Sequence, residues 1–135
     1  MTITLPVERI IGEEGLELTD AGAKLAMRLP WYRSLPFSVV EVEEVTLNGA
    51  PLDLSNAQIA YDGQSWPLAD NGEQTNAFWF VRDSAFLILP NLPVAKGEAV
   101  EVQLTLYISP PSIPGMRRFN VQSEKLTVQS AAGAT

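Results

Sequence analysis

The chain has 135 residues, of which 46% are apolar and 19% are charged, a composition typical of one globular domain and too apolar for intrinsic disorder. Its net charge of −7 argues against nucleic acid and anionic membranes as partners, because both require a surplus of Lys and Arg. There is no run approaching the ~20 apolar residues that cross a bilayer, and residues 1–6 lack a signal-peptide pattern. We therefore expect a single cytoplasmic domain over residues 1–135, with a flexible tail at 130–135.

The chain contains neither histidine nor cysteine. This composition removes disulfides, thiolate metal sites and the side chains that most often perform acid–base and nucleophilic catalysis. A carboxylate pair could still catalyse a reaction, as in glycosidases, but the acidic residues fall mostly in turns or at alternating strand positions such as Glu41 and Glu43. We predict that this chain has no catalytic residue, binds no cofactor and holds no metal.

The first predicted strands form a hairpin, with alternating apolar and polar residues over 16–19 and 24–29 around an Asp20-Ala21-Gly22 turn. In the next strand, which begins at Val40, the apolar phase slips by one residue at Glu43-Glu44. Because side chains alternate strictly along a strand, the slip predicts a β-bulge or a strand that changes sheets. Asn48-Gly49 then predicts a tight turn, and Pro51 limits the return strand to a short piece.

The second half of the chain continues with a hairpin of 58–61 and 64–68 around Asp62-Gly63. The runs 78–81 and 86–89 are apolar without alternation, which indicates strands that are covered on both faces or have one face against a partner; we expect core. Residues 100–108 form the cleanest alternating strand, and 121–129 form the last one.

These elements predict an all-β fold. There is no helical stripe of ten or more residues, and about eight strands are separated by turn residues. This spacing is typical of a two-layer antiparallel β-sandwich of jelly-roll or immunoglobulin-like kind.

Two loops, 28–37 and 109–119, contain no carboxylate in a chain that has 16 acidic residues. They hold half of the 10 prolines, which stiffen them, and they carry aromatic and Arg side chains of the types that dominate binding interfaces. We call them the first and second acid-free loops. The residues predicted to contact a partner, and to line the rim of its active site, are Arg28, Trp31, Tyr32, Arg33, Arg117, Arg118 and Phe119.

Three interpretations of these loops remain open from the residues alone. Trp31 and Phe119 could plug the end of the sandwich while the arginines coat the surface. The flat aromatic rings would also suit a stand-alone carbohydrate-binding module, since apolar sugar faces stack on them. The third interpretation is a protein partner, which fits the combination of aromatic and Arg residues.

The run from Arg28 to Gly49, which joins the first acid-free loop to the strand and Asn-Gly turn behind it, resembles the small β subunits of bacterial C-glycoside deglycosidases. The resemblance extends in outline over most of the chain. It implies a hetero-oligomer with a larger α subunit, a sugar-isomerase-like (β/α)-barrel that holds a divalent metal, usually manganese, and the catalytic residues.

The resemblance also implies a reaction, which is cleavage of the carbon–carbon bond between a sugar and an aromatic aglycone. A C-glycoside has no exocyclic oxygen to protonate, so the carboxylate-pair mechanism of ordinary glycosidases does not transfer directly. In this family the substrates are 3-oxo-glycosides made by a separate oxidase. The ketone acidifies the neighbouring C2 proton, and removal of that proton lets the aglycone leave by elimination, which makes the complex a lyase.

Overall fold

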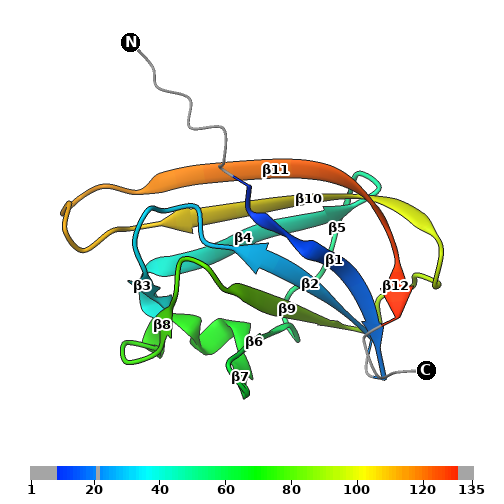
Figure 1. Ribbon diagram of the computed structural model, residues 1–135, viewed down its shortest axis with the longest axis horizontal. Coiled ribbons are helices and arrows are strands. Elements are labelled where there is room, and N and C mark those ends of the chain that lie inside the picture. The colour runs from blue at the N-terminus through cyan, green and yellow to red at the C-terminus, as the bar shows by residue number, and fades with distance from the viewer. Residues whose placement is uncertain (1–8, 21, 131–135) are drawn as a thin grey trace, which may run out of the picture.

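A six-stranded sheet forms one layer of the molecule (Figure 1). The computed structural model describes residues 9–20 and 22–130, and in this part the strand order is β12-β1-β2-β9-β6-β7. Neighbouring strands are antiparallel except β1 and β12, which pair in parallel. The strands of this sheet are β1 (Ile11–Thr19), β2 (Gly22–Arg28), β6 (Gln58–Tyr61), β7 (Gln64–Pro67), β9 (Ser84–Pro90) and β12 (Gln129–Ser130).

A four-stranded antiparallel sheet with the order β11-β10-β4-β5 forms the second layer. Its strands are β4 (Val40–Leu47), β5 (Ala50–Pro51), β10 (Ala99–Ile108) and β11 (Arg118–Thr127). A short antiparallel pair, β3 (Leu35–Pro36) and β8 (Phe78–Trp79), lies at the left-hand end of the molecule in Figure 1. Two 3-10 helices, η1 (Phe37–Val39) and η2 (Leu68–Glu73), flank this pair.

Side chains from both layers meet in one apolar core, which confirms the predicted all-β sandwich. The inward face of β10 is fully apolar, as its alternation predicted, and it packs with the inward residues of β2 and β9. Eight of the strands in the described part of the chain have four or more residues, and the other four have two each. The inward residues of β10 are Val100, Val102, Leu104, Leu106 and Ile108.

The two layers are joined where β11 passes into β12. Only Val128 separates these strands, which belong to different sheets. Val128 is buried, its N–H donates to the carbonyl of Glu98 at 2.9 Å, and its own carbonyl accepts from the N–H of Gly97 at 2.8 Å. Farther back along β11, the side-chain oxygen of Gln122 accepts from the backbone N–H of Ile11 at 2.9 Å, which ties β11 to the start of β1.

The predicted turns at Asn48-Gly49 and Asp62-Gly63 and the predicted irregularity at Glu43-Glu44 are confirmed, whereas the predicted Asp20-Ala21-Gly22 turn includes residue 21, which lies outside the described residues. Asn48 and Asp62 have φ values of 51°, and the glycines that follow them have φ values of 87° and 78°, as tight hairpin turns require. In the pairing of β4 with β10, Thr105 faces Glu44 and Leu106 faces Val42, so Glu43 is the extra residue of a β-bulge.

The prediction that 78–81 and 86–89 are covered on both faces is wrong. Phe78 is 48% exposed and Phe80 is 57% exposed, and of the strand only Trp79 between them is fully buried. In β9 burial alternates, with Leu87 and Leu89 buried and their neighbours half-buried. The strand β9 belongs to one layer of a two-layer fold and β8 to the short β3–β8 pair, so only one face of each strand meets the core.

The ends of the chain fall partly outside the described residues. Of the predicted flexible tail at 130–135, Ser130 belongs to β12, and 131–135 lie outside the described part, as do residues 1–8 and 21. The domain organisation stays a prediction. None of the helices in the described part is long or apolar enough to cross a membrane.

Candidate docking surface

The first acid-free loop is anchored at both ends and exposed in the middle. Leu29 and Pro30 are buried at its start, and Leu35 and Phe37 are buried at its end. Between these anchors Tyr32 is 69% exposed. The chain is therefore pinned on each side of the segment that it presents to solvent, and less conformational entropy is lost when such a segment binds.

An aromatic cluster holds the end of this loop in place. Phe37 stacks on Trp79 with ring centroids 5.3 Å apart and planes 4° from parallel. The edges of Trp66 and Tyr61 each meet Phe37 at 5.1 Å. Since these rings come from η1, β6, β7 and β8, the cluster ties the loop to three other elements.

A buried amide completes the anchor. Asn71 in η2 accepts a hydrogen bond from Trp66 Nε1 at 2.8 Å and donates to the carbonyl oxygens of Phe37 at 2.9 Å and Val40 at 2.8 Å. Asn71 is 5% exposed, so these bonds form away from water. The sequence offered no sign of this role, because Asn71 lies in a stretch rich in turn residues.

The structure brings the two acid-free loops together. The guanidinium carbon of Arg118 lies 5.9 Å from the centre of the Trp31 ring, within the range of a cation–π contact. The backbone N–H of Ser109 also donates to the carbonyl of Val39 at 2.9 Å, next to the end of the first loop. Trp31 is half-buried and packs against the core, so it is partly the plug that one interpretation expected. Phe119, by contrast, is 55% exposed.

Two of the predicted arginines are engaged within the chain. Arg28 donates to the carbonyl of Arg82 at 2.7 Å and thereby holds the turn after β8. Arg117 pairs with Glu41 at 2.7 Å and lies 3.6 Å from the centre of the Tyr107 ring. The hydrogen bond to Glu41 raises the pKa of the Arg117 guanidinium, which keeps it charged.

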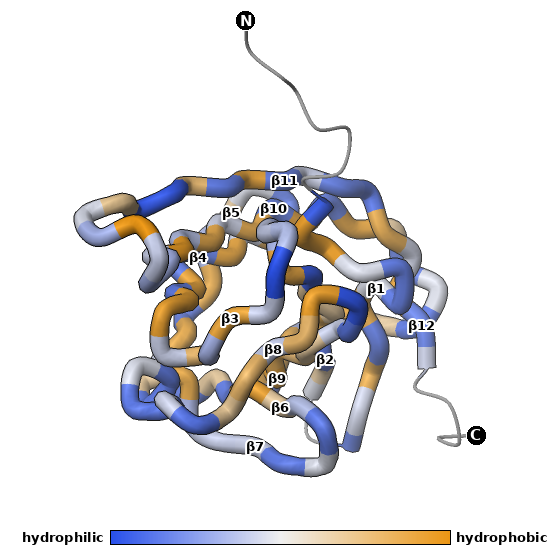
Figure 2. The backbone as a smooth tube through the Cα atoms, turned by 60° about the vertical axis from the view of Figure 1, so that its left-hand side comes forward, coloured by the Kyte–Doolittle hydropathy of each residue, from blue (hydrophilic) through white to orange (hydrophobic). Residues whose placement is uncertain are grey.

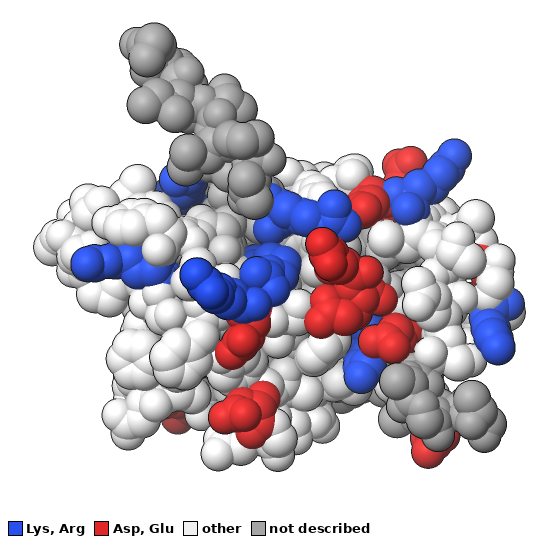
Figure 3. All heavy atoms as spheres, in the orientation of Figure 1, with Lys and Arg blue, Asp and Glu red and all other residues white. Residues whose placement is uncertain are grey.

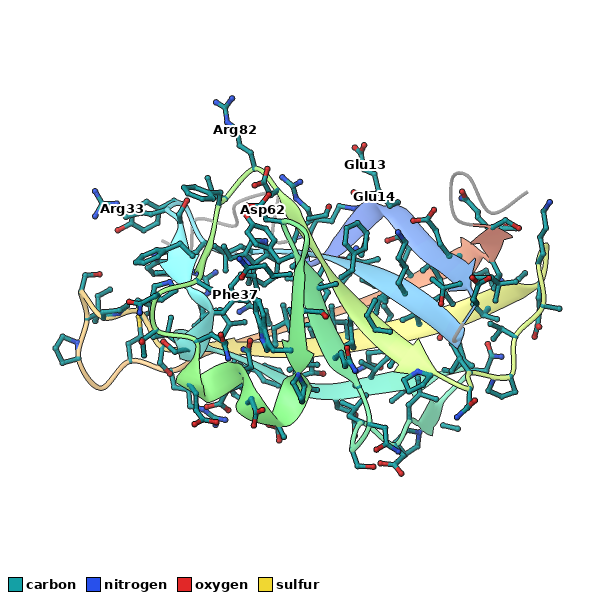
Figure 4. The ribbon with its side chains drawn as sticks, turned by 90° about the horizontal axis from the view of Figure 1, so that it is seen from below. Glu13, Glu14, Arg33, Phe37, Asp62 and Arg82 are labelled. Carbon is teal, nitrogen blue, oxygen red and sulfur yellow. The ribbon has the colours of Figure 1, made fainter. Side chains whose placement is uncertain are left out.

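Arg33 and Arg82 are the cations that extend freely from this end. Figure 4 shows both side chains pointing away from the body of the protein, whereas Phe37 lies inside. Arg33 lies 5.7 Å from the Tyr32 ring, and no ion pair is found for either arginine among the described residues. Figure 3 shows basic side chains over the left-hand part of the molecule, next to a wide area without charged side chains.

Sequence reasoning missed Phe78 and Phe80. They lie beside the first loop, because Phe78 pairs with Pro36 in the β3–β8 pair and the N–H of Val81 donates to Ser34 Oγ at 3.1 Å. Figure 2 shows the apolar segment around β8 running next to β3. The run without alternation was the only sequence signal, and the alternative that one face of this run meets a partner stays a prediction.

An open groove of about 580 Å³ lies beside these two phenylalanines. Tyr61 and Trp66 form part of its wall, and Asp62 and Glu73 bring two carboxylates to it. The Tyr61 hydroxyl donates to Asp83 at 2.7 Å and accepts from the N–H of Phe80 at 3.0 Å. Burial, followed by the hydrogen bond to Asp83, raises the pKa of Tyr61.

Comparisons with known proteins identify the family of the chain. A family model described as C-glycoside deglycosidase beta subunit matches residues 9–109, which include the first acid-free loop and end where the second begins. The 3'-dehydrocarminate deglycosidase beta subunit of a Microbacterium species is 40% identical over 107 residues, 79% of this chain and 80% of the relative.

Two further relatives carry the same description. A C-glycoside deglycosidase beta subunit of Arthrobacter globiformis is 35% identical over 99 residues, which cover 71% of this chain and 75% of the relative. Another, from Microbacterium trichothecenolyticum, is 27% identical over 128 residues, 94% of this chain and 98% of the relative. The chain therefore belongs to the C-glycoside deglycosidase beta subunit family.

Proposed function

We propose that this chain is the non-catalytic β subunit of a C-glycoside-cleaving lyase complex, and that it binds and orders a larger α subunit. The proposal rests on family membership together with one observation, which is the exposed, carboxylate-free surface of Tyr32 and Arg33 at the end where both acid-free loops meet. Large aromatic and Arg side chains on pinned loops are the groups that most often dominate the free energy of association.

The proposal divides the chemistry between the subunits. We assign to the α subunit a metal-dependent (β/α)-barrel that cleaves 3-oxo-C-glycosides by elimination, with the base and the divalent metal, expected to be manganese. Among residues 9–20 and 22–130, no group of three or more carboxylates is placed to hold a metal ion. The part that we assign to this chain is to support the mouth of the barrel, in the reducing cytoplasm that its cysteine-free sequence suits.

The test is co-purification of tagged chain with the α subunit of the same organism. Tyr32→Ala combined with Arg33→Ala should weaken the complex at least tenfold, because both side chains are exposed and are of the types that dominate protein contacts. Lys96→Ala is the matched control, since Lys96 is an exposed cation in the loop between β9 and β10, at the opposite end of the molecule in Figure 1. It should leave the complex unchanged.

If the double variant binds the α subunit as tightly as wild type does, Tyr32 and Arg33 do not contact the α subunit. A stand-alone carbohydrate-binding module would instead bind sugars without an α subunit, and titration of the isolated chain with glucosides distinguishes that function. Cleavage of a 3-oxo-C-glycoside by the isolated chain would contradict the non-catalytic role.

A further inference from the structure

The groove beside Phe78 and Phe80 belongs to neither acid-free loop, and about half of its lining is apolar. It lies at the end of the molecule where the two loops meet, which we call the docking end. Phe78 and Phe80 are two residues apart on an extended segment, so their side chains share a face, and both line the groove. Together with Tyr32 they place three largely exposed aromatic rings at one end of the molecule. Exposed apolar surface of this density is typical of a protein contact.

The groove is preformed. Trp66, held by Asn71, and Tyr61, held by Asp83, fix its inner wall. The bond from the N–H of Phe80 to the Tyr61 hydroxyl fixes the position of the segment opposite. Binding of a partner in this groove therefore costs little conformational entropy, because the groove is already ordered.

The charge of the groove is opposite to that of the loops. Asp62 and Glu73 line it, no Lys or Arg does, and neither carboxylate makes an ion pair among the described residues. Asp62 lies at the tip of the β6–β7 turn, on the same side of the molecule as Arg33 and Arg82 in Figure 4. The docking end thus carries both the basic side chains of the loops and the two carboxylates of the groove.

The area that a stable protein contact requires also indicates that the α subunit covers the groove. A stable protein contact covers roughly 800 Å² on each partner, so we expect an α subunit seated on Tyr32 to cover neighbouring surface as well. The groove is that neighbour, because Phe78 is paired with Pro36 of the first loop.

We propose that the groove receives a segment of the α subunit in which an apolar side chain, packed on Phe78 and Phe80, is flanked by Lys or Arg facing Asp62 and Glu73. This inference rests on the proposed function and deepens it. The opposite charges of loops and groove then set the orientation of the α subunit, since a reversed arrangement would place like charges together.

The experiment measures the dissociation constant of the co-purified complex by dilution, with circular dichroism of each variant to verify folding. Phe80→Ser should raise the constant at least tenfold, and Phe80→Leu should restore most of the affinity. Asp62→Lys combined with Glu73→Lys should raise it at least tenfold at low salt and less at 0.5 M NaCl. Asp20→Lys, in the exposed turn after β1, is the charge control and should have no effect.

Each alternative result has a distinct meaning. If groove variants bind normally while Tyr32→Ala with Arg33→Ala does not, the inference is wrong and the proposed function stands. If groove variants bind normally but raise KM for the glycoside, the groove holds substrate instead, and the inference is again wrong. If the wild-type chain forms no complex with the α subunit, the proposed function itself fails.

Discussion

A single amide, that of Asn71, satisfies three buried groups and thereby joins η2 to the aromatic cluster. Asn71→Ala leaves Trp66 Nε1 and the carbonyls of Phe37 and Val40 without their partner. Because buried unpaired groups keep their desolvation penalty, we expect a loss of about 2–4 kcal/mol in the free energy of unfolding, measured by urea denaturation. Asn76→Ala, at an exposed amide on the same segment, should change it by less than about 0.5 kcal/mol. Equal stability of the two variants would contradict the anchoring role.

Tyr61 gives the stability a dependence on alkaline pH. Its pKa is raised in the folded state, so its contribution is complete below the unfolded value of about 10 and is lost as the pH rises through the higher folded value. Tyr61→Phe lacks the hydroxyl and should be less stable than wild type at pH 8. The difference should narrow as the pH rises above about 10, as measured by thermal unfolding.

Tyr32→Phe is the control for this experiment, because no hydrogen bond of the Tyr32 hydroxyl is found among the described residues. Its difference from wild type should stay small at every pH. A Tyr61→Phe difference that stays constant up to pH 12 would show that the hydroxyl does not link pH to folding.

At the scale of elements, the close approach of β2 and β9 requires a glycine. A Cβ on Gly22 would lie 2.3 Å from the carbonyl oxygen of Leu89 and 2.7 Å from the N–H nitrogen of Asn91, and backbone atoms cannot yield as a flexible side chain does. We expect Gly22→Ala to cost about 2–4 kcal/mol in urea denaturation.

Gly63→Ala separates this clash from backbone strain alone. Gly63 has a φ value of 78°, but a Cβ there would meet nothing within 4 Å. Gly63→Ala should therefore lower the free energy of unfolding by only about 1 kcal/mol, which is the cost of placing alanine in the left-handed conformation. If both alanine variants lose the same free energy, β2 and β9 do not approach as closely as described.

The turns and strands could be predicted from sequence wherever neighbouring residues alone determine the backbone conformation. Asn48-Gly49 and Asp62-Gly63 have few alternatives to tight turns. The phase slip at Glu43 located the irregularity, and the pairing of β4 with β10 shows that it is a bulge, not a change of sheet. The segment 78–81 could not be placed in this way. An apolar run looks the same whether it is covered by the protein's own core or by a partner, and only the tertiary arrangement distinguishes the two.

At the scale of the whole molecule, an acidic protein presents a basic and aromatic end. Its net charge is −7, yet Arg33 and Arg82 extend from the docking end. If the facing surface of the α subunit is acidic, the association rate constant should fall as NaCl rises from 50 to 500 mM, by stopped-flow mixing. Arg33→Glu should flatten this dependence and Lys96→Glu should not; an unchanged slope in Arg33→Glu would exclude steering by this end.

The candidate site could be predicted in part from composition. The absence of acidic residues marked both loops, and the contact of Arg118 with Trp31 places them side by side. Sequence could not reveal that Arg28 and Arg117 are engaged within the chain, since their partners, the carbonyl of Arg82 and Glu41, are remote in sequence. Nor could it reveal the groove, whose walls come from the β6–β7 hairpin and from the segment that runs from η2 to β8.

The passage of β11 into β12 through Val128 has a mechanical consequence. One continuous stretch of chain belongs to both layers, so neither can peel away without pulling on the other. We therefore expect amide hydrogens in β1 and β10 to exchange with deuterium at one shared, slow rate that reports complete unfolding of the protein. Faster exchange throughout one layer than in the other would show that this layer can unfold while the other stays folded.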